Sequence, residues 1–255
     1  MPHRRLFAIV IARALAVAGG VAVVVWSAQS GQLAWRDLGL SDAAAKVAGE
    51  EPFKDELLAG LEPKMAAVES DPACSPSALH DVAVIRLRQA EIAMVGGKQA
   101  EIDPALRRLD AVARRSLQCS PMDPFLWLAL YWVDVQLNGA RAEAVAPLEM
   151  SYRLGPNEGW IALRRSRYGL AAFDEVSPAT REAILNEERS LLDAGFAKEV
   201  GENLTGAGWP IHDLILARLA DATAENRELL ARRLRRDGYE MRVPGIVLDE
   251  TRPWD

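Results

Sequence analysis

Cysteine and histidine are scarce in this chain of 255 residues, which has two cysteines and three histidines. The histidines are His3, His80 and His212, far apart in the sequence, and the cysteines are Cys74 and Cys119. A structural zinc site needs about four clustered ligands of these two types. We therefore expect no metal site and no cofactor.

The signature motifs of common enzyme classes are also missing. The chain contains neither G-x-x-x-x-G-K-[ST] nor G-x-G-x-x-G, which bind nucleotides, and neither G-x-S-x-G nor H-E-x-x-H, which mark hydrolases. The pairs His80-Asp81 and His212-Asp213 are adjacent and face different directions on a helix, so we interpret them as surface or capping positions. We predict no enzyme and no catalytic residue. A pair of carboxylates acting as acid and base is the alternative that the acid-rich composition leaves open.

Aromatic residues make up only 6% of the chain and strand-like runs are few, whereas 50% of the residues are apolar and 26% are charged. This balance favours a folded, all-α protein. The formal net charge is −6, and Arg4, Arg5 and Arg13 lie in the first 26 residues with no acid among them. The rest of the chain has 27 basic against 36 acidic residues. Such an acidic body argues against a nucleic-acid partner, which requires a basic face.

One long apolar run lies near the start of the chain. Residues 6–26 are 21 residues with a single charge, Arg13, and they end at Trp26. As a helix they would span about 31 Å, close to the hydrocarbon thickness of a bilayer. Arg4 and Arg5 precede the run, so the positive-inside rule places the N-terminus in the cytoplasm. We predict a single-pass anchor in a bacterial inner membrane, with the body in the periplasm.

Two other interpretations of this run stay open. One is a cleaved signal peptide, although the apolar region of such peptides is about 7–15 residues long. The other is a buried helix of a soluble protein. An anchor and a signal peptide both place the body outside the cytoplasm, where disulfides form.

A helical hairpin is predicted between the two cysteines. Apolar residues recur at helical spacing over 77–95, and Gly96-Gly97 then breaks the pattern. A second helix is predicted over 103–118, with Asp103 as its N-cap and Pro104 in its first turn.

The ends of an antiparallel hairpin lie close together, and each cysteine flanks one of these ends. We therefore predict a disulfide between Cys74 and Cys119, whose Cα atoms should lie roughly 4.4–6.8 Å apart. Two buried thiols are the alternative.

Residues 113–163 contain similar segments 33–35 positions apart, such as "WLAL" at 127–130 and "WIAL" at 160–163. Periods of this length are typical of stacked helical hairpins. The segment "GARAEAVAPLEMSYRLGP" (139–156) resembles the second helix of a tetratricopeptide (TPR) repeat. The matching positions are Gly139, Ala144, Leu148, Ser151, Leu154 and Pro156. Trp132 and Pro147 depart from the family's pattern. The resemblance implies a TPR-like α-solenoid of stacked antiparallel hairpins, and it brings no catalytic residue.

Further helices are predicted over 123–137, which is apolar nearly all round, and over 158–173 and 177–196. A last hairpin is predicted over 211–220 and 223–238. The predicted organisation is a cytoplasmic stub and anchor (1–28), a linker with short helices around 34–47 and 52–68 (29–70), a TPR-like domain (71–242) and an extended tail (243–255). We expect the tail to pack back on the helices; a partner-binding end is the alternative.

A cluster of arginines stands out in the acidic body. Arg164, Arg165 and Arg167 lie near Arg153 in the sequence, and Trp160 and Tyr168 are close by. Arginine forks bind carboxylates through two hydrogen bonds, and aromatic rings stack on sugars or peptides. These residues are therefore the candidate binding site. A solvated helix face and a set of core aromatics are the alternative interpretations.

We predict that the protein is a non-catalytic, membrane-anchored scaffold or adaptor. It would bind protein partners of a cell-envelope machine, such as one for polysaccharide synthesis or export, secretion or division. Helical stacks offer extended concave surfaces for this purpose. The alternative is a periplasmic binding module for an acidic glycan or peptide, which the arginine cluster favours. An enzyme with cryptic carboxylates is the third hypothesis.

Overall fold

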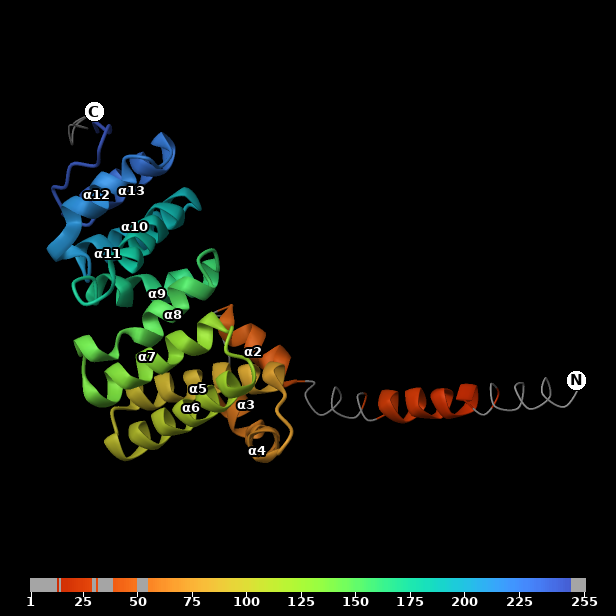
Figure 1. Ribbon diagram of the computed structural model, residues 1–255. Coiled ribbons are helices and arrows are strands. Elements are labelled where there is room, and N and C mark those ends of the chain that lie inside the picture. Colours follow the sequence, from red (N-terminus) through yellow and green to blue (C-terminus); the bar gives the residue numbers. More distant parts are fainter. Residues whose placement is uncertain (1–12, 14, 29–30, 32–38, 50–54, 249–255) are drawn as a thin grey trace, which may run out of the picture. The chain divides into compact units, whose positions relative to one another are not determined.

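The computed structural model describes residues 13, 15–28, 31, 39–49 and 55–248. Every regular element in these ranges is a helix, so the all-α prediction is confirmed for them (Figure 1). The chain divides into two compact units, residues 1–71 and residues 72–255.

The first unit contains a helical stretch over residues 15–28 and the short helices α2 (Leu40–Ala48), α3 (Asp55–Gly60) and α4 (Glu62–Ser70). The apolar side chains of residues 15–28 are exposed, among them Val24 and Trp26. Much of the predicted anchor, residues 6–12 and 14, lies outside the described residues, as do residues 32–38 and 50–54 of the predicted linker. Within the described ranges, no helix combines the length and the apolar character that crossing a bilayer requires.

The second unit begins with a helical hairpin formed by α5 (Pro76–Gly96) and α6 (Gln99–Cys119), which lie side by side (Figure 1). Helix α5 ends at Gly97, whose φ of 69° lies in the left-handed region that favours glycine. The Cα atoms of Cys74 and Cys119 are 6.3 Å apart. The prediction that the hairpin brings the two cysteines to disulfide distance is confirmed.

The predicted start of the second hairpin helix is wrong. Helix α6 begins at Gln99, so Asp103 is not its N-cap and Pro104 lies inside the helix. Side-chain hydrogen bonds stabilise the additional turn: Gln99 donates to Asp103 at 2.6 Å, and Lys98 donates to Glu101 at 3.0 Å. Pro104 is the sixth residue of α6 and has no N–H to donate to the carbonyl of Ala100, so one backbone hydrogen bond of the helix is missing.

Helix α7 (Pro124–Asn138) packs against α6 and is buried on most of its surface, as its apolar sequence predicts. Its start is fixed by Asp123, whose side chain accepts hydrogen bonds from the backbone N–H groups of Phe125 and Leu126. Helix α7 therefore begins where its N-cap residue Asp123 and its continuous apolar run both predict.

The segment that resembles the second TPR helix is divided into two pieces. A 3-10 turn, η1 (Ala142–Ala144), precedes α8 (Ala146–Leu154), which packs against α7. Pro147 lies in the first turn of α8, where backbone N–H groups make no hydrogen bond within the helix. The proline therefore costs no helical hydrogen bond. Helix α8 has only nine residues, so the longer helix that the resemblance implies is not formed.

Five more α-helices complete the unit: α9 (Gly159–Ala171), α10 (Pro178–Asp193), α11 (Ala197–Thr205), α12 (His212–Leu219) and α13 (Ala224–Arg236), with the 3-10 turn η2 (Trp209–Ile211) before α12. Ser177 caps α10 through its side chain, as predicted. Helix α11 was not among the predicted helices, because its buried aliphatic side chains are only Val200 and Leu204.

The predicted pairing of the last two helices is wrong. Helix α12 packs mainly against α10, and α13 packs mainly against α11, rather than against each other. Helices α12 and α13 therefore pack on the preceding helices, α10 and α11. The tail packs on α13: Val243 is buried, Arg227 donates to the carbonyl of Pro244, and Arg235 donates to the carbonyl of Leu248 at 3.1 Å. Residues 249–255 lie outside the described part.

Candidate functional site

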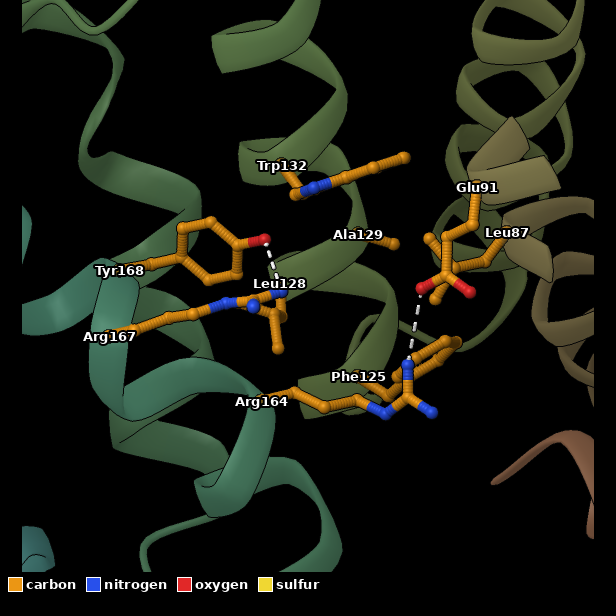
Figure 2. Close-up of a pocket in the computed structure, with 9 residues that line it drawn as sticks. All are labelled: Leu87, Glu91, Phe125, Leu128, Ala129, Trp132, Arg164, Arg167 and Tyr168. Atoms are coloured by element: carbon orange, nitrogen blue, oxygen red, sulfur yellow. Dashed lines mark hydrogen bonds and ion pairs between the residues drawn. The ribbon is translucent and has the colours of Figure 1, made fainter. Parts of the chain in front are cut away.

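Two of the predicted binding arginines lie at a pocket formed by three helices. We call it the arginine pocket. Arg164, Arg167 and Tyr168 reach it from α9, and side chains of α5 and α7 form its other walls (Figure 2). Its complete lining is Leu87, Glu91, Phe125, Leu128, Ala129, Trp132, Arg164, Arg167 and Tyr168. The pocket thus combines two guanidinium groups with three aromatic rings and one carboxylate.

The two arginines are held in different ways. Nη1 of Arg164 lies 3.4 Å from Oε1 of Glu91, whose other oxygen lies 3.4 Å from Nη1 of Arg88. The guanidinium of Arg167 lies over the ring of Tyr168, 4.8 Å from its centroid, and donates to the tyrosine hydroxyl at 2.8 Å (Figure 2). Among the described residues, Arg167 has no carboxylate partner, although acidic residues outnumber basic ones in the body of the chain.

The arginine pocket is small and open to solvent at one side. Its cavity volume is about 30 Å³, which exceeds the roughly 10–15 Å³ that a single water requires. Sites for drug-sized ligands measure about 300–1,000 Å³. The pocket therefore accommodates one small group, such as a carboxylate, and is too small for a sugar ring.

The other predicted site residues do not join this pocket. Arg153 is exposed on α8 and contacts the sulfur of Met150 at 3.1 Å. Trp160 lies at a different cavity, next to His80 and Glu158. Arg165 is fully buried. The six candidate residues, Arg153, Arg164, Arg165, Arg167, Trp160 and Tyr168, therefore do not form one surface.

Arg165 is the centre of a buried polar cluster. It forms an ion pair with Glu187 of α10, and it donates to the backbone carbonyls of Ser151 at 2.7 Å and Gly155 at 3.1 Å. Its guanidinium also lies over the ring of Tyr152, 4.0 Å from the centroid. These contacts join α8, α9 and α10, so the role of Arg165 is structural.

A second buried carboxyl belongs to the same cluster. Glu188 is fully buried, and its Oε1 accepts a hydrogen bond of 2.9 Å from the amide of Asn203, which also donates to Ser166. Oε2 of Glu188 has no hydrogen-bond partner. Burial, and then the neighbouring charge of Glu187, raise the pKa of Glu188 to about 8. The cluster thus has one guanidinium, the carboxyl group of Glu187 that pairs with it, and the carboxyl group of Glu188, which keeps its proton at pH 7.

Some residues of the arginine pocket were not predicted as site residues. Glu91 lies 73 positions before Arg164 in the sequence, so no local pattern links them. Leu87 and Phe125 are apolar residues that the sequence indicates only as core. Trp132 offered a signal, since it departs from the small residue that the TPR pattern prefers, and here its side chain forms a wall of the pocket (Figure 2).

No group of three or more histidine, cysteine, aspartate or glutamate side chains in the described residues is arranged to hold a metal ion. The two adjacent histidine–aspartate pairs differ from each other. His80 bonds to Asp123 rather than to Asp81, whereas Nε2 of His212 lies 3.5 Å from Oδ1 of Asp213, so the prediction that this pair faces different directions is wrong; the ring of His212 also stacks on Trp209. Comparisons with protein-family models, with curated proteins and with solved structures find no match to this chain.

Proposed function

We propose that this protein is a non-catalytic adaptor, and that its arginine pocket binds an acidic side chain of a partner protein. The observation that carries the proposal is Arg167, an arginine without a carboxylate partner in the described residues, placed beside Arg164 at the rim of an aromatic pocket. A guanidinium so placed offers two parallel N–H groups to an incoming carboxylate.

The size of the arginine pocket selects among acidic ligands. A volume of about 30 Å³ fits the carboxylate of an aspartate or glutamate but not the ring of a uronic acid. A partner protein is therefore favoured over an acidic glycan.

The adaptor is proposed to be tethered to a bacterial inner membrane, with its body in the periplasm. The apolar side chains of residues 15–28 are exposed, and such a surface requires an apolar environment. The cysteine pair at disulfide distance fits an oxidising compartment. The proposed TPR-like relationship of the second unit is supported by the helices α5 to α8, each of which packs on the one before it.

A direct binding experiment tests the pocket. The full-length protein in detergent micelles is titrated against a fluorescein-labelled Gly-Ser peptide that carries several glutamates, and fluorescence anisotropy is recorded. We expect binding that weakens as salt screens the charges. The double variant Arg164→Gln/Arg167→Gln should weaken it at least fivefold, about 1 kcal/mol. Arg165 is left unchanged because it is buried.

The matched control is Arg107→Gln/Arg114→Gln. These two arginines of α6 are exposed, and each is paired with an aspartate four residues before it. The control removes the same charge and should leave binding unchanged. The peptide with glutamine in place of glutamate should not bind. Equal loss of binding in both double variants would attribute the attraction to net charge and would overturn the proposed site.

A further inference from the structure

A second cavity lies next to the arginine pocket and has the opposite charge. We call it the acidic pocket; it has a volume of about 330 Å³. Its lining is His80, Ser120, Met122, Asp123, Pro124, Glu158, Trp160 and Ile161. No lysine or arginine is among these residues, so the positive groups near the two carboxylates are His80 and the N-terminal ends of α7 and α9.

A single aromatic ring separates the two pockets. Phe125 lines the arginine pocket, and its ring centroid is 5.4 Å from that of His80 and 5.1 Å from that of Trp160, which both line the acidic pocket. Phe125 is buried and lies in the first turn of α7. Phe125 therefore contacts side chains of both pockets, and the two linings are neighbours in the fold.

Asp123 has a structural role in the acidic pocket. One of its oxygens accepts the N–H groups of Phe125 and Leu126, and the other lies 2.5 Å from Nδ1 of His80. Both oxygens of Asp123 therefore already contact groups of the protein. Its charge contributes to the pocket, but its oxygens are not the groups that a ligand would contact first.

Glu158 is in a different situation. It is the N-cap residue of α9, yet its side chain makes no capping hydrogen bond, and it is exposed. It has no ion pair in the described part of the chain. The Cβ position of Gly155 would lie 3.1 Å from Cγ of Glu158 and closer still to Pro124, so the absence of a side chain at Gly155 lets Glu158 pack here. Glu158 thus places an exposed carboxylate at the acidic pocket, with no hydrogen bond to the described residues.

Two further polar groups of the pocket are available. Nε2 of His80 and the indole N–H of Trp160 have no hydrogen-bond partner among the described residues. The aromatic ring of Trp160 adds a surface on which a cation is attracted by the π electrons. A carboxylate with an indole beside it is a combination that recognises ammonium and guanidinium groups.

We propose that the acidic pocket binds a lysine or arginine side chain of the same partner segment whose acidic side chain occupies the arginine pocket. This inference rests on the proposed adaptor function and specifies its partner: a segment with an acidic and a basic residue close together. Opposite charges in adjacent pockets also fix the direction of the segment, because the reversed segment places like charges together.

The experiment uses synthetic peptides and the full-length protein in detergent micelles. One peptide set carries only lysine, one carries only glutamate, and one carries one of each, separated by glycine spacers of increasing length. Binding is measured by anisotropy, and the indole N–H signal of Trp160 is followed by nuclear magnetic resonance, after its assignment with Trp160→Phe. We expect the mixed peptide of the best spacing to bind at least fivefold more tightly than either single-charge peptide, and the lysine peptides to shift the Trp160 signal.

Charge variants separate the two pockets. Glu158→Gln should weaken the lysine and mixed peptides several-fold and leave the glutamate peptide unchanged. The control is Glu143→Gln, which removes an exposed carboxylate of η1 that lines neither pocket. Unchanged lysine binding in Glu158→Gln, with glutamate binding still dependent on Arg164 and Arg167, would overturn this inference alone. Loss of lysine binding in Glu158→Gln, with glutamate binding insensitive to the two arginines, would overturn the proposed function and leave the acidic pocket standing.

Discussion

Arg165 and Glu187 form an ion pair from which solvent is excluded, with Nε of the arginine 3.2 Å from Oε2 of the glutamate and Nη2 also donating to that oxygen. Both side chains are buried, and they join α9 to α10. Burial raises the pKa of Glu187, while the guanidinium of Arg165 opposes that effect. A buried pair of this kind is most sensitive to the loss of one partner, since the other charge is then left without compensation.

The first prediction concerns this pair. Arg165→Met should lower the free energy of unfolding by about 3–5 kcal/mol, because Glu187 and the carbonyls of Ser151 and Gly155 lose their partner. The double variant Arg165→Met/Glu187→Met should recover much of that loss. Urea denaturation followed by circular dichroism measures both. The control Arg107→Met, at an exposed pair on α6, should change stability by less than about 1 kcal/mol.

Glu188 should make stability depend on pH. Its pKa in the folded protein is about 8, above the ordinary value of 4.5 for a glutamate. Between these values the folded state binds more protons than the unfolded state, so stability is highest below about 4.5 and falls as the pH rises towards and through 8.

Glu188→Gln tests this origin, because glutamine resembles the protonated carboxyl and keeps an acceptor for Asn203. The free energy of unfolding of the variant should decrease much less between pH 6 and pH 9 than that of the wild type. An equally steep decrease in the variant would assign the effect to another group. Glu182→Gln, at an exposed position of α10, is the matched control.

A third prediction concerns a close approach of two helices. A Cβ atom on Gly169 would collide with the hydroxyl oxygen of Tyr152, which is buried and has no hydrogen-bond partner. Gly169→Ala should therefore destabilise the protein by about 1–3 kcal/mol. Tyr152→Phe removes the oxygen and should restore part of the loss in the double variant, because Cζ of the ring and Cγ1 of Ile184 would still lie 3.0 Å from the new Cβ. Thermal melts of the four proteins give the coupling; additive effects would contradict the collision.

The cysteine pair gives a fourth prediction. Protein isolated with thiol exchange trapped should show no alkylation at Cys74 or Cys119 before reduction and two modified thiols after it, as read by mass spectrometry. In the chain-entropy model, closing a loop of 45 residues stabilises the fold by about 4 kcal/mol. The variant Cys74→Ser/Cys119→Ser should lose a stability of that order. Two alkylated cysteines without reduction would refute the bond.

Local signals account for what the sequence predicted correctly. Ser177 before Pro178, the glycine pair at the end of α5 and the apolar run of α7 each act within a few residues, and the helices begin or end there. Asp103 before Pro104 has the same start signal. The side-chain pairs Lys98–Glu101 and Gln99–Asp103, which are three and four residues apart, instead favour a start one turn earlier. The two possible starts lie within one turn of each other, so the sequence does not decide between them.

The candidate site depends on longer distances in the chain. Arg164, Arg165 and Arg167 look alike in the sequence, yet one contacts Glu91, one is buried against Glu187 and one stacks on Tyr168. The direction in which α9 presents each residue decides between these environments, and that direction follows from packing against α5, α7 and α10. Sequence alone therefore found the right helix but could not separate binding arginines from a structural one.

The cysteine pair at the open end of the α5–α6 hairpin has a topological consequence. Once oxidised, it converts these two helices into a closed covalent ring whose opposite end is the exposed turn near Gly97. A protease that cuts in that turn would open the ring without releasing either piece. The nicked protein would migrate as one chain until it is reduced, and the two helices would keep their high effective concentration for each other.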